Sequence, residues 1–239
     1  SWLSVLNGCL DPFNTDPASP SARCDRNIVS SSFFRSDEFQ LKGLYVYLFY
    51  RAAFGYRVAD GLVLPAYSEI VTDLRAVTGR DTADLHQKRA AFAEAFVQRP
   101  EFVTAYGGLT NQAYVDALLG RYNLPQITTE DPATPEGTTQ VVLTRQQLVE
   151  QLASGALSRA RVLRALVQSD ELSRETTGRE YNNAFVAMQY YGYLRRTPEE
   201  NGYQGWLRVL NNEPNGLRTM IHGFLNSPEY QLRFGRIER

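Results

Sequence analysis

One short phrase recurs along this chain: a small or charged residue, a second residue, a glutamate and then a bulky apolar residue. Its four copies read Ser36-Asp37-Glu38-Phe39, Arg99-Pro100-Glu101-Phe102, Ser169-Asp170-Glu171-Leu172 and Ser227-Pro228-Glu229-Tyr230. The copies stand roughly 60 to 70 residues apart, and self-similarity at a near-constant period indicates one supersecondary unit used several times. The chain is therefore predicted to be built from related units.

Each copy of the phrase closes a predicted unit that holds an aromatic helix, a polar or Gly/Pro break and two further helices. The aromatic run 44–54 is apolar on almost every side, which favours a helix buried on most faces. From Leu217 to Leu225 the apolar residues follow the i, i+3, i+4, i+7, i+8 pattern of an amphipathic helix. Thr197 is predicted to cap the helix before that one, with Pro198 at its first position. We expect an all-α fold of repeated helical units packed as one globular body.

Four segments are predicted along the chain. They are an N-terminal arm with a disulfide loop (1–30), a first helical unit (31–110), a degenerate middle unit (111–172) and a C-terminal helical unit (173–239). Within the middle unit, residues 123–142 form a Thr/Pro/Glu stretch without periodicity and are expected to be a long loop. Loops of that length are uncommon in a compact domain and are usually functional or disordered.

The repeated phrase is interpreted as structural rather than catalytic. In the fourth copy, Ser227 suits a helix N-cap, Pro228 suits the first helical position, and Glu229 lies in the first turn near the positive end of the helix dipole. Tyr230 would then hold this short helix on the core. The same role is expected for the corresponding residues of the other copies, Ser36, Glu38, Phe39, Glu101, Phe102, Ser169 and Glu171.

Composition sets the class of protein. The 239 residues suit one large or two small domains, and 43% hydrophobic with 21% charged residues is typical of a globular chain. A net charge of −1 argues against nucleic acid or an anionic membrane as partner. Of the 25 basic residues only Lys42 and Lys88 are lysines. Arginine is enriched at protein interfaces, although codon usage alone would give the same bias.

The two cysteines, Cys9 and Cys24, bracket a loop rich in Pro, Asp and Ser. This spacing predicts one disulfide, which stabilises a loop of that size by roughly 3 kcal/mol and implies an oxidising compartment. Two free thiols in a cytosolic protein are the alternative. The chain starts without Met or a signal peptide and has no run of about 18 apolar residues that would span a membrane. We expect an extracellular or cell-surface protein whose leader has been removed.

Several phrases of the last unit resemble a bacterial helical domain of unknown function. They are Phe185-Val186, Gly192-Tyr193-Leu194-Arg195-Arg196-Thr197-Pro198, Gly202-x-x-Gly205-Trp206-Leu207 and Ser227-Pro228-Glu229-Tyr230. That family is found in secreted and surface-associated proteins and is similar to the linker domains of phycobilisomes. It usually has glycine where this chain has Arg195. The resemblance extends more weakly to residues 31–106 and 111–172, so about three copies are expected. It implies a helical fold and protein association, with no catalytic residues.

No nucleotide-binding, hydrolase or EF-hand motif occurs in the sequence, so we expect neither an enzyme nor a cofactor. His86 and His222 have no neighbouring ligand at i+3 or i+4, which argues against zinc. The aspartates Asp11, Asp16 and Asp25 do not have the spacing of a calcium loop. No metal is therefore predicted.

We expect a non-catalytic extracellular module that mediates protein–protein association, either with itself or with neighbouring surface proteins, as in a surface polymer or filament. The arm of residues 1–30 and the stretch 123–142 are expected to have few internal partners and to wrap a neighbour. The alternative is a carbohydrate- or small-ligand-binding module of a larger secreted protein. Its platform, or an interface at the same place, would consist of Trp206, Tyr193, Arg195 and Arg196.

Overall fold

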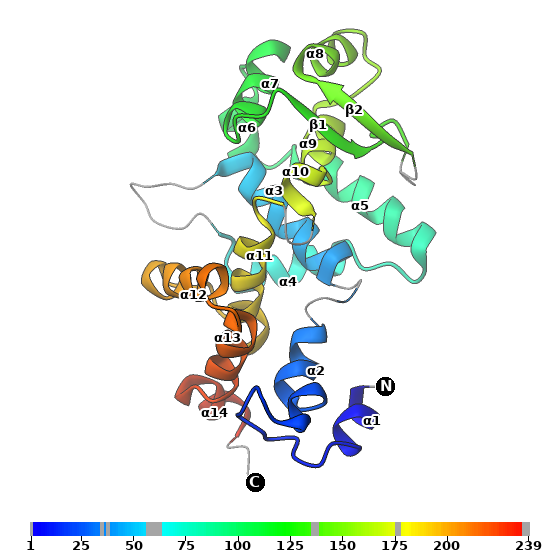
Figure 1. Cartoon of the computed structure of the whole chain (residues 1–239). Coiled ribbons are helices and arrows are strands. Elements are labelled where there is room, and N and C mark those ends of the chain that lie inside the picture. The colour runs from blue at the N-terminus through cyan, green and yellow to red at the C-terminus, as the bar shows by residue number, and fades with distance from the viewer. Residues whose placement is uncertain are drawn as a thin grey trace. The chain divides into compact units, whose positions relative to one another are not determined.

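A computed structural model describes most of the chain (Figure 1). The described residues fall into two compact units, which are treated separately below. Unit 1 combines residues 1–43 with 182–239, and unit 2 comprises residues 44–181. Helices dominate both units, which confirms the predicted helical fold class. The structure describes residues 2–33, 36, 39–55, 64–134, 139–174 and 178–235, without the side chains of Trp2 and Phe33.

This division by contacts differs from the four predicted segments, because the N-terminal arm and the C-terminal residues belong to the same unit. The described elements of unit 1 are α1 (Trp2–Asn7), η1 (Pro20–Arg23), α2 (Arg26–Phe33), α11 (Tyr181–Gln189), η3 (Tyr190–Leu194), α12 (Glu200–Asn212), α13 (Gly216–Leu225) and α14 (Pro228–Phe234). The π-helical turn η2 (Phe39–Leu44) leads from unit 1 into unit 2.

The N-terminal arm is held inside unit 1 more firmly than its sequence indicates. Cys9 and Cys24 form the predicted disulfide. Asp25 is fully buried and accepts two hydrogen bonds from the guanidinium group of Arg218, on α13. Asn14 donates to the same carboxylate at 3.2 Å. The expectation of an arm with few internal partners is therefore wrong, because buried polar groups pair with distant partners that a local pattern does not reveal.

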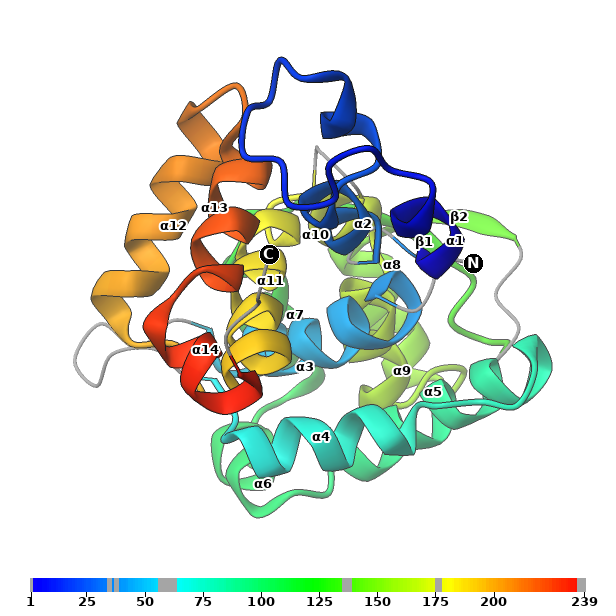
Figure 2. The ribbon, with the colours of Figure 1, turned by 90° about the horizontal axis from the view of Figure 1, so that it is seen from below.

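Helices α12 and α13 lie side by side in both views of the molecule (Figures 1 and 2). The start of α12 differs from its prediction: its N-cap is Glu199, and Thr197 and Pro198 lie outside the helix. Arg196 explains the later start, since its guanidinium group donates to the Thr197 carbonyl and to the Glu199 carboxylate. These bonds hold the segment before α12 in a non-helical conformation.

Unit 2 contains the other elements. They are α3 (Tyr45–Phe54), α4 (Tyr67–Ala76), α5 (Thr82–Phe96), α6 (Pro100–Tyr106), α7 (Asn111–Gly120), β1 (Gln126–Glu130), β2 (Gln140–Thr144), α8 (Arg145–Ala153), α9 (Arg159–Val167) and α10 (Asp170–Ser173). Helix α3 is buried along nearly its whole length, as its apolar sequence predicts. Phe49 on α3 packs edge-on against Phe92 of α5 at a centroid distance of 5.1 Å, in a geometry that the ring quadrupoles favour.

The predicted long loop at 123–142 is the main correction to the fold. Residues 126–130 and 140–142 of this stretch belong to strands β1 and β2, which form an antiparallel hairpin, and residues 135–138 lie outside the described part. The buried side chains of Ile127, Thr129 and Leu143 alternate with more exposed neighbours, which is the period-2 pattern of a half-buried strand. Pairing between the two strands supplies the backbone hydrogen bonds that a single extended segment lacks.

Across the described ranges, no helix is both long and apolar enough to cross a membrane.

Candidate functional site

The β1–β2 hairpin of unit 2 has two outer edges that differ in what occupies them. Asp131 N–H donates to the Thr139 carbonyl at 2.8 Å, and Arg145 N–H donates to the Pro125 carbonyl at 3.2 Å. These bonds continue the ladder at odd-numbered residues, so the odd-numbered residues of β1 and β2 bond across the hairpin. Antiparallel ladders alternate, and the even-numbered residues therefore direct their backbone groups outward.

The outer edge of β1 is occupied. Thr128 N–H points away from β2 and donates to both carboxylate oxygens of Glu171, at 3.0 and 3.1 Å. Glu171 belongs to the third copy of the repeated phrase and lies in the first turn of α10. A carboxylate on an outward N–H satisfies the donor and blocks strand addition at this edge.

The outer edge of β2 is open as far as the described residues show. The backbone groups of Gln140 and Val142 form no hydrogen bond with any described residue. Thr144 N–H is occupied, because it donates to the Gln147 side chain at 2.9 Å in the capping box of α8. The Val142 side chain is 51% exposed, and β2 carries no charged residue. Natural edge strands are commonly protected by charge, proline or a covering element, and the described part of β2 has none of these.

The repeated phrase starts a short helix in three of its four copies. Helices α6, α10 and α14 begin at its second residue, and Ser227 Oγ caps α14 by accepting from Tyr230 N–H at 3.1 Å. Ser169 is buried and donates instead to the Leu166 carbonyl. In the first copy, Phe39 is buried and begins η2, whereas Glu38 lies outside the described residues and Ser36 is half-buried.

The glutamates of the phrase differ in what they contact. Glu229 forms a bidentate ion pair with Arg196, with distances of 2.8 and 2.9 Å. That pair lowers the pKa of the Glu229 carboxyl below its usual range. Glu171 binds the hairpin as described above, while Glu101 is exposed in the first turn of α6. The apolar positions that follow, Phe102 and Leu172, are both buried.

The residues predicted as an interface or ligand platform lie together in unit 1. Tyr193 is 9% exposed, and its ring contacts Phe224 and Tyr230 at centroid distances of 5.8 Å. The Trp206 ring packs against Phe224 at 5.5 Å. These rings pack within the unit.

Two arginines complete the predicted platform. Arg195 has left-handed backbone angles, φ 48° and ψ 40°. Its guanidinium group lies 4.8 Å from the centre of the Phe234 ring. Arg196 stacks 5.1 Å from the centre of the Tyr190 ring while it pairs with Glu199 and Glu229. A glycine at the Arg195 position would adopt the left-handed conformation without strain.

The residues weighed as metal ligands take part in local contacts. Asp11 and Asp16 accept hydrogen bonds from backbone N–H groups two residues later, which closes small turns. Asp25 is the partner of Arg218. His222 is half-buried, and burial lowers its pKa, as do the charges of Arg26 and Arg218. His86 is also half-buried, on α5.

Comparison with known families gives one match: residues 172–234 fit the model of a domain of unknown function (DUF4214). The match covers residues 173–234 of the predicted C-terminal unit (173–239), and the second and third copies of the repeat stay a prediction. No curated protein and no solved structure matches the chain. The matched region begins at Leu172, next to the glutamate that holds β1, and includes all of α11 to α14.

The open strand edge was missed by sequence reasoning, although a local signal is present. Residues 126–130 and 140–144 are rich in Thr, Val and Ile, and a segment containing Pro and Gly separates them. That is the pattern of a hairpin with a long turn. No local signal indicates that Glu171 satisfies β1 while β2 stays open, because this depends on where α10 packs.

Proposed function

We propose that this chain is a non-catalytic module that associates with other copies of itself by adding a strand at the outer edge of β2. The open backbone groups of Gln140 and Val142 carry this proposal. An extended partner can satisfy such groups by main-chain hydrogen bonds, with side chains at alternate positions providing specificity. The Cys9–Cys24 disulfide supports an extracellular or cell-surface setting for this association.

The register of the contact follows from which groups are free. In an antiparallel pair related by a two-fold axis at Val141, Gln140 of each copy lies opposite Val142 of the other. Each such pair exchanges two hydrogen bonds, so the contact forms about four. The facing side chains carry no charge, which avoids repulsion across the pair. A register centred on Val142 is less favourable, because it needs Thr144 N–H, which Gln147 already binds.

A two-fold contact closes a dimer, so a surface polymer would require a second, independent contact. Unit 1 offers apolar side chains for one. In the N-terminal arm Leu3 is 70% exposed and Leu10 is 97% exposed, and on α14 Leu232 is 88% exposed. Burial of these side chains in such a contact would remove apolar surface from water, which favours association. We propose that the polymer, if formed, uses these residues rather than the hairpin.

The association is tested by light scattering on a size-exclusion column over a wide concentration range. The wild-type chain is expected to form concentration-dependent dimers. Val142→Lys should shift the equilibrium to monomer, because a lysine on an edge strand disfavours pairing. Gln126→Lys is the matched control, since it adds the same charge to an exposed position on β1. A monomer at every concentration, or equal behaviour of the two variants, would contradict strand addition.

The ligand-binding alternative stays a prediction. Tyr193 and Arg196 already make contacts within unit 1, and no observation on these residues favours a sugar over a protein partner. The proposed relation of the unmatched repeats, 31–106 and 111–172, to the DUF4214 unit is likewise part of this proposal. It rests on the shared position of the phrase at the start of α6, α10 and α14.

A further inference from the structure

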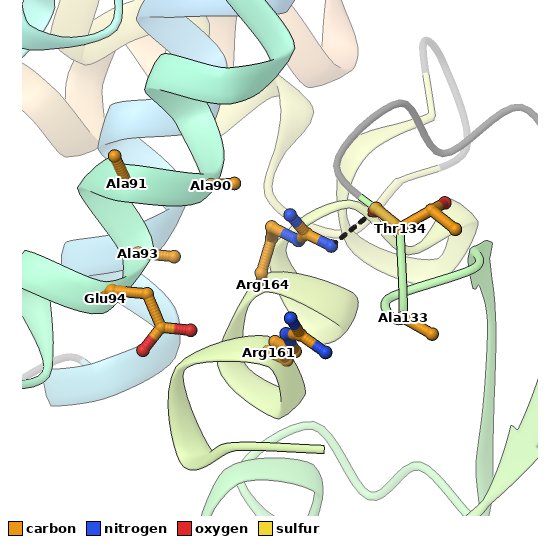
Figure 3. A pocket seen from close by; sticks show the side chains of 8 residues that line it. All are labelled: Ala90, Ala91, Ala93, Glu94, Ala133, Thr134, Arg161 and Arg164. Carbon is orange, nitrogen blue, oxygen red and sulfur yellow. Dashed lines mark hydrogen bonds between the residues drawn. The ribbon is translucent and has the colours of Figure 1, made fainter. Parts of the chain in front are cut away.

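Unit 2 contains a hollow of about 150 Å³ between α5, α9 and the residues that follow β1 (Figure 3). Three alanines of α5 form one wall, and Ala133 and Thr134 form the opposite one. A hollow of this size exceeds the roughly 10–15 Å³ that one water requires. It therefore has room for a small polyatomic ion.

Two arginines on one face of α9 point into this space. Arg161 and Arg164 are three residues apart, so their side chains leave the helix on the same side, and Figure 3 shows both guanidinium groups between α5 and Thr134. Arg164 is 5% exposed, and its Nη2 donates to the carbonyls of Pro132 and Thr134 at 2.8 and 2.7 Å. Its buried Nε has no partner in the described part of the chain.

The charge of these arginines is not balanced by any ion pair among the described residues. Arg161 is half-buried, and its guanidinium group forms neither a hydrogen bond nor an ion pair with any described residue. Arg89 on α5 is 6% exposed, and its buried Nε and Nη1 are also without partners in the described ranges. Burial lowers the pKa of Arg164, and the charges of Arg161 and Arg89 lower it further. Tyr45 and Glu130 raise this pKa but do not cancel the lowering.

Two carboxylates near these arginines accept hydrogen bonds from neutral side chains. Glu94, which lines the hollow at its rim, accepts one from Ser158 Oγ at 3.0 Å. Glu130 accepts from Gln168 Nε2 at 2.5 Å. Buried charges in folded proteins are nearly always paired, because removing a charge from water is costly unless a counter-charge replaces the water. The buried guanidinium group of Arg164 has no carboxylate partner among the described residues, and the charge of half-buried Arg161 lies beside it, which indicates a ligand of negative charge.

We propose that this hollow binds a small oxyanion, a phosphate or sulfate group, between the guanidinium groups of Arg161 and Arg164. Planar guanidinium groups bind such anions through paired, charge-assisted hydrogen bonds. The short side chains of Ala90 and Ala93 leave the space that the anion fills. Glu94 adds one negative charge to the rim, which favours a single small anion over a polyanion.

The proposal is tested by calorimetric titration of the whole chain with inorganic phosphate at constant ionic strength. The wild-type chain is expected to bind one phosphate saturably. Arg161→Gln should weaken binding at least about tenfold, since it removes charge-assisted hydrogen bonds. Arg75→Gln is the matched control: it removes the same charge from an exposed position on α4 and should leave binding unchanged.

A second variant separates binding from folding, because Arg164 also holds Pro132 and Thr134 and its loss would disturb both. Ala90→Glu leaves both arginines in place but adds a carboxylate to the wall that faces Arg164, and it should abolish phosphate binding. Titration with sulfate and with glycerol phosphate distinguishes the sources of the group. Binding of the ester identifies a group carried by a larger molecule, and binding of the free ions alone identifies an inorganic ion. Absence of saturable binding by all three, or wild-type affinity in Arg161→Gln, would overturn the proposal.

Discussion

Arg51 and Glu180 form a buried, bidentate ion pair across 129 positions of sequence. Arg51 Nε and Nη2 lie 3.2 and 3.1 Å from the two carboxylate oxygens of Glu180, and the side chains are 9% and 5% exposed. The pair joins the central helix α3 to the residues just before α11, within unit 2. It closes unit 2 by connecting residues near its two sequence ends.

Breaking this pair should destabilise unit 2. Removal of one partner leaves the other charge buried and unpaired, which costs roughly 3–5 kcal/mol. We expect Glu180→Gln and Arg51→Met each to lower the free energy of unfolding by about that amount, measured by denaturant unfolding followed by circular dichroism. The double variant should lose much less than the sum of the two. Additive losses would show that the two charges are not coupled in this way.

Unit 1 should lose stability in acid. Burial alone would raise the pKa of Asp25, but hydrogen bonds from Arg218, Ile28 N–H and Asn14 and the charge of Arg218 together lower it. A carboxyl whose folded pKa lies below its unfolded value of about 3.9 contributes stability above that pH. This contribution is lost as the pH falls through the folded pKa, and the lowered pKa of Glu229 acts in the same direction.

The measurement uses fluorescence, because Trp2 and Trp206 both belong to unit 1. The unfolding midpoint should be nearly constant from pH 7 to about pH 5 and should fall below about pH 4. Asp25→Asn should lower the midpoint at pH 7 and flatten the acid part of the profile. Glu213→Gln, which removes an exposed carboxylate from the same unit, is the control and should follow the wild-type profile. An unchanged profile in Asp25→Asn would contradict the assignment.

The left-handed conformation of Arg195 should be measurable as strain. A non-glycine residue in this conformation costs roughly 1–2 kcal/mol, which glycine avoids. Both Arg195→Gly and Arg195→Ala lose the contact with Phe234, so their difference isolates the backbone. We expect the glycine variant to be the more stable by about 1 kcal/mol in denaturant unfolding. At Arg208, exposed within α12, the order should be reversed because alanine favours a helix over glycine.

Loss of the disulfide should destabilise the N-terminal arm. The two cysteines are 15 residues apart in sequence, and closing a loop of that size stabilises the folded state by about 3 kcal/mol in the chain-entropy model. Cys9→Ser/Cys24→Ser should lower the unfolding free energy of unit 1 by this order, as reported by tryptophan fluorescence. Peptide mapping without reductant should recover the two cysteines in one linked fragment from the wild-type chain. Recovery of both as alkylated thiols would contradict the pairing.

Much of the helical fold follows from local patterns. The apolar spacing from Leu217 to Leu225 predicts α13, and the aromatic run 44–54 predicts α3 within one residue of its observed start. Ser227 with Pro228 predicts the cap of α14. Each of these signals acts over one or two helical turns. The contacts that form the helix therefore lie between residues close together in sequence.

The prediction of a loop at 123–142 is wrong because a strand is stabilised by hydrogen bonds to a partner strand that the local sequence does not specify. A five-residue strand has no internal hydrogen bonds, and β1 and β2 are stable only when they pair in the observed register. The start of α12 also depends on contacts outside the helix. Arg196 forms ion pairs with Glu199 and Glu229, and these pairs keep the preceding residues out of the helix.

The amino-acid sequence alone determined the helical class, the disulfide and the short helices that begin within the repeated phrase, because caps, apolar periodicity and turn residues act on neighbours in sequence. Only the tertiary structure decided that Glu171 occupies one edge of the hairpin, that the edge at Gln140 and Val142 stays open, and that Arg161 and Arg164 face one hollow. These features depend on contacts between residues that are 30 or more positions apart in sequence. Packing of those residues then decides which buried polar groups have hydrogen-bond partners.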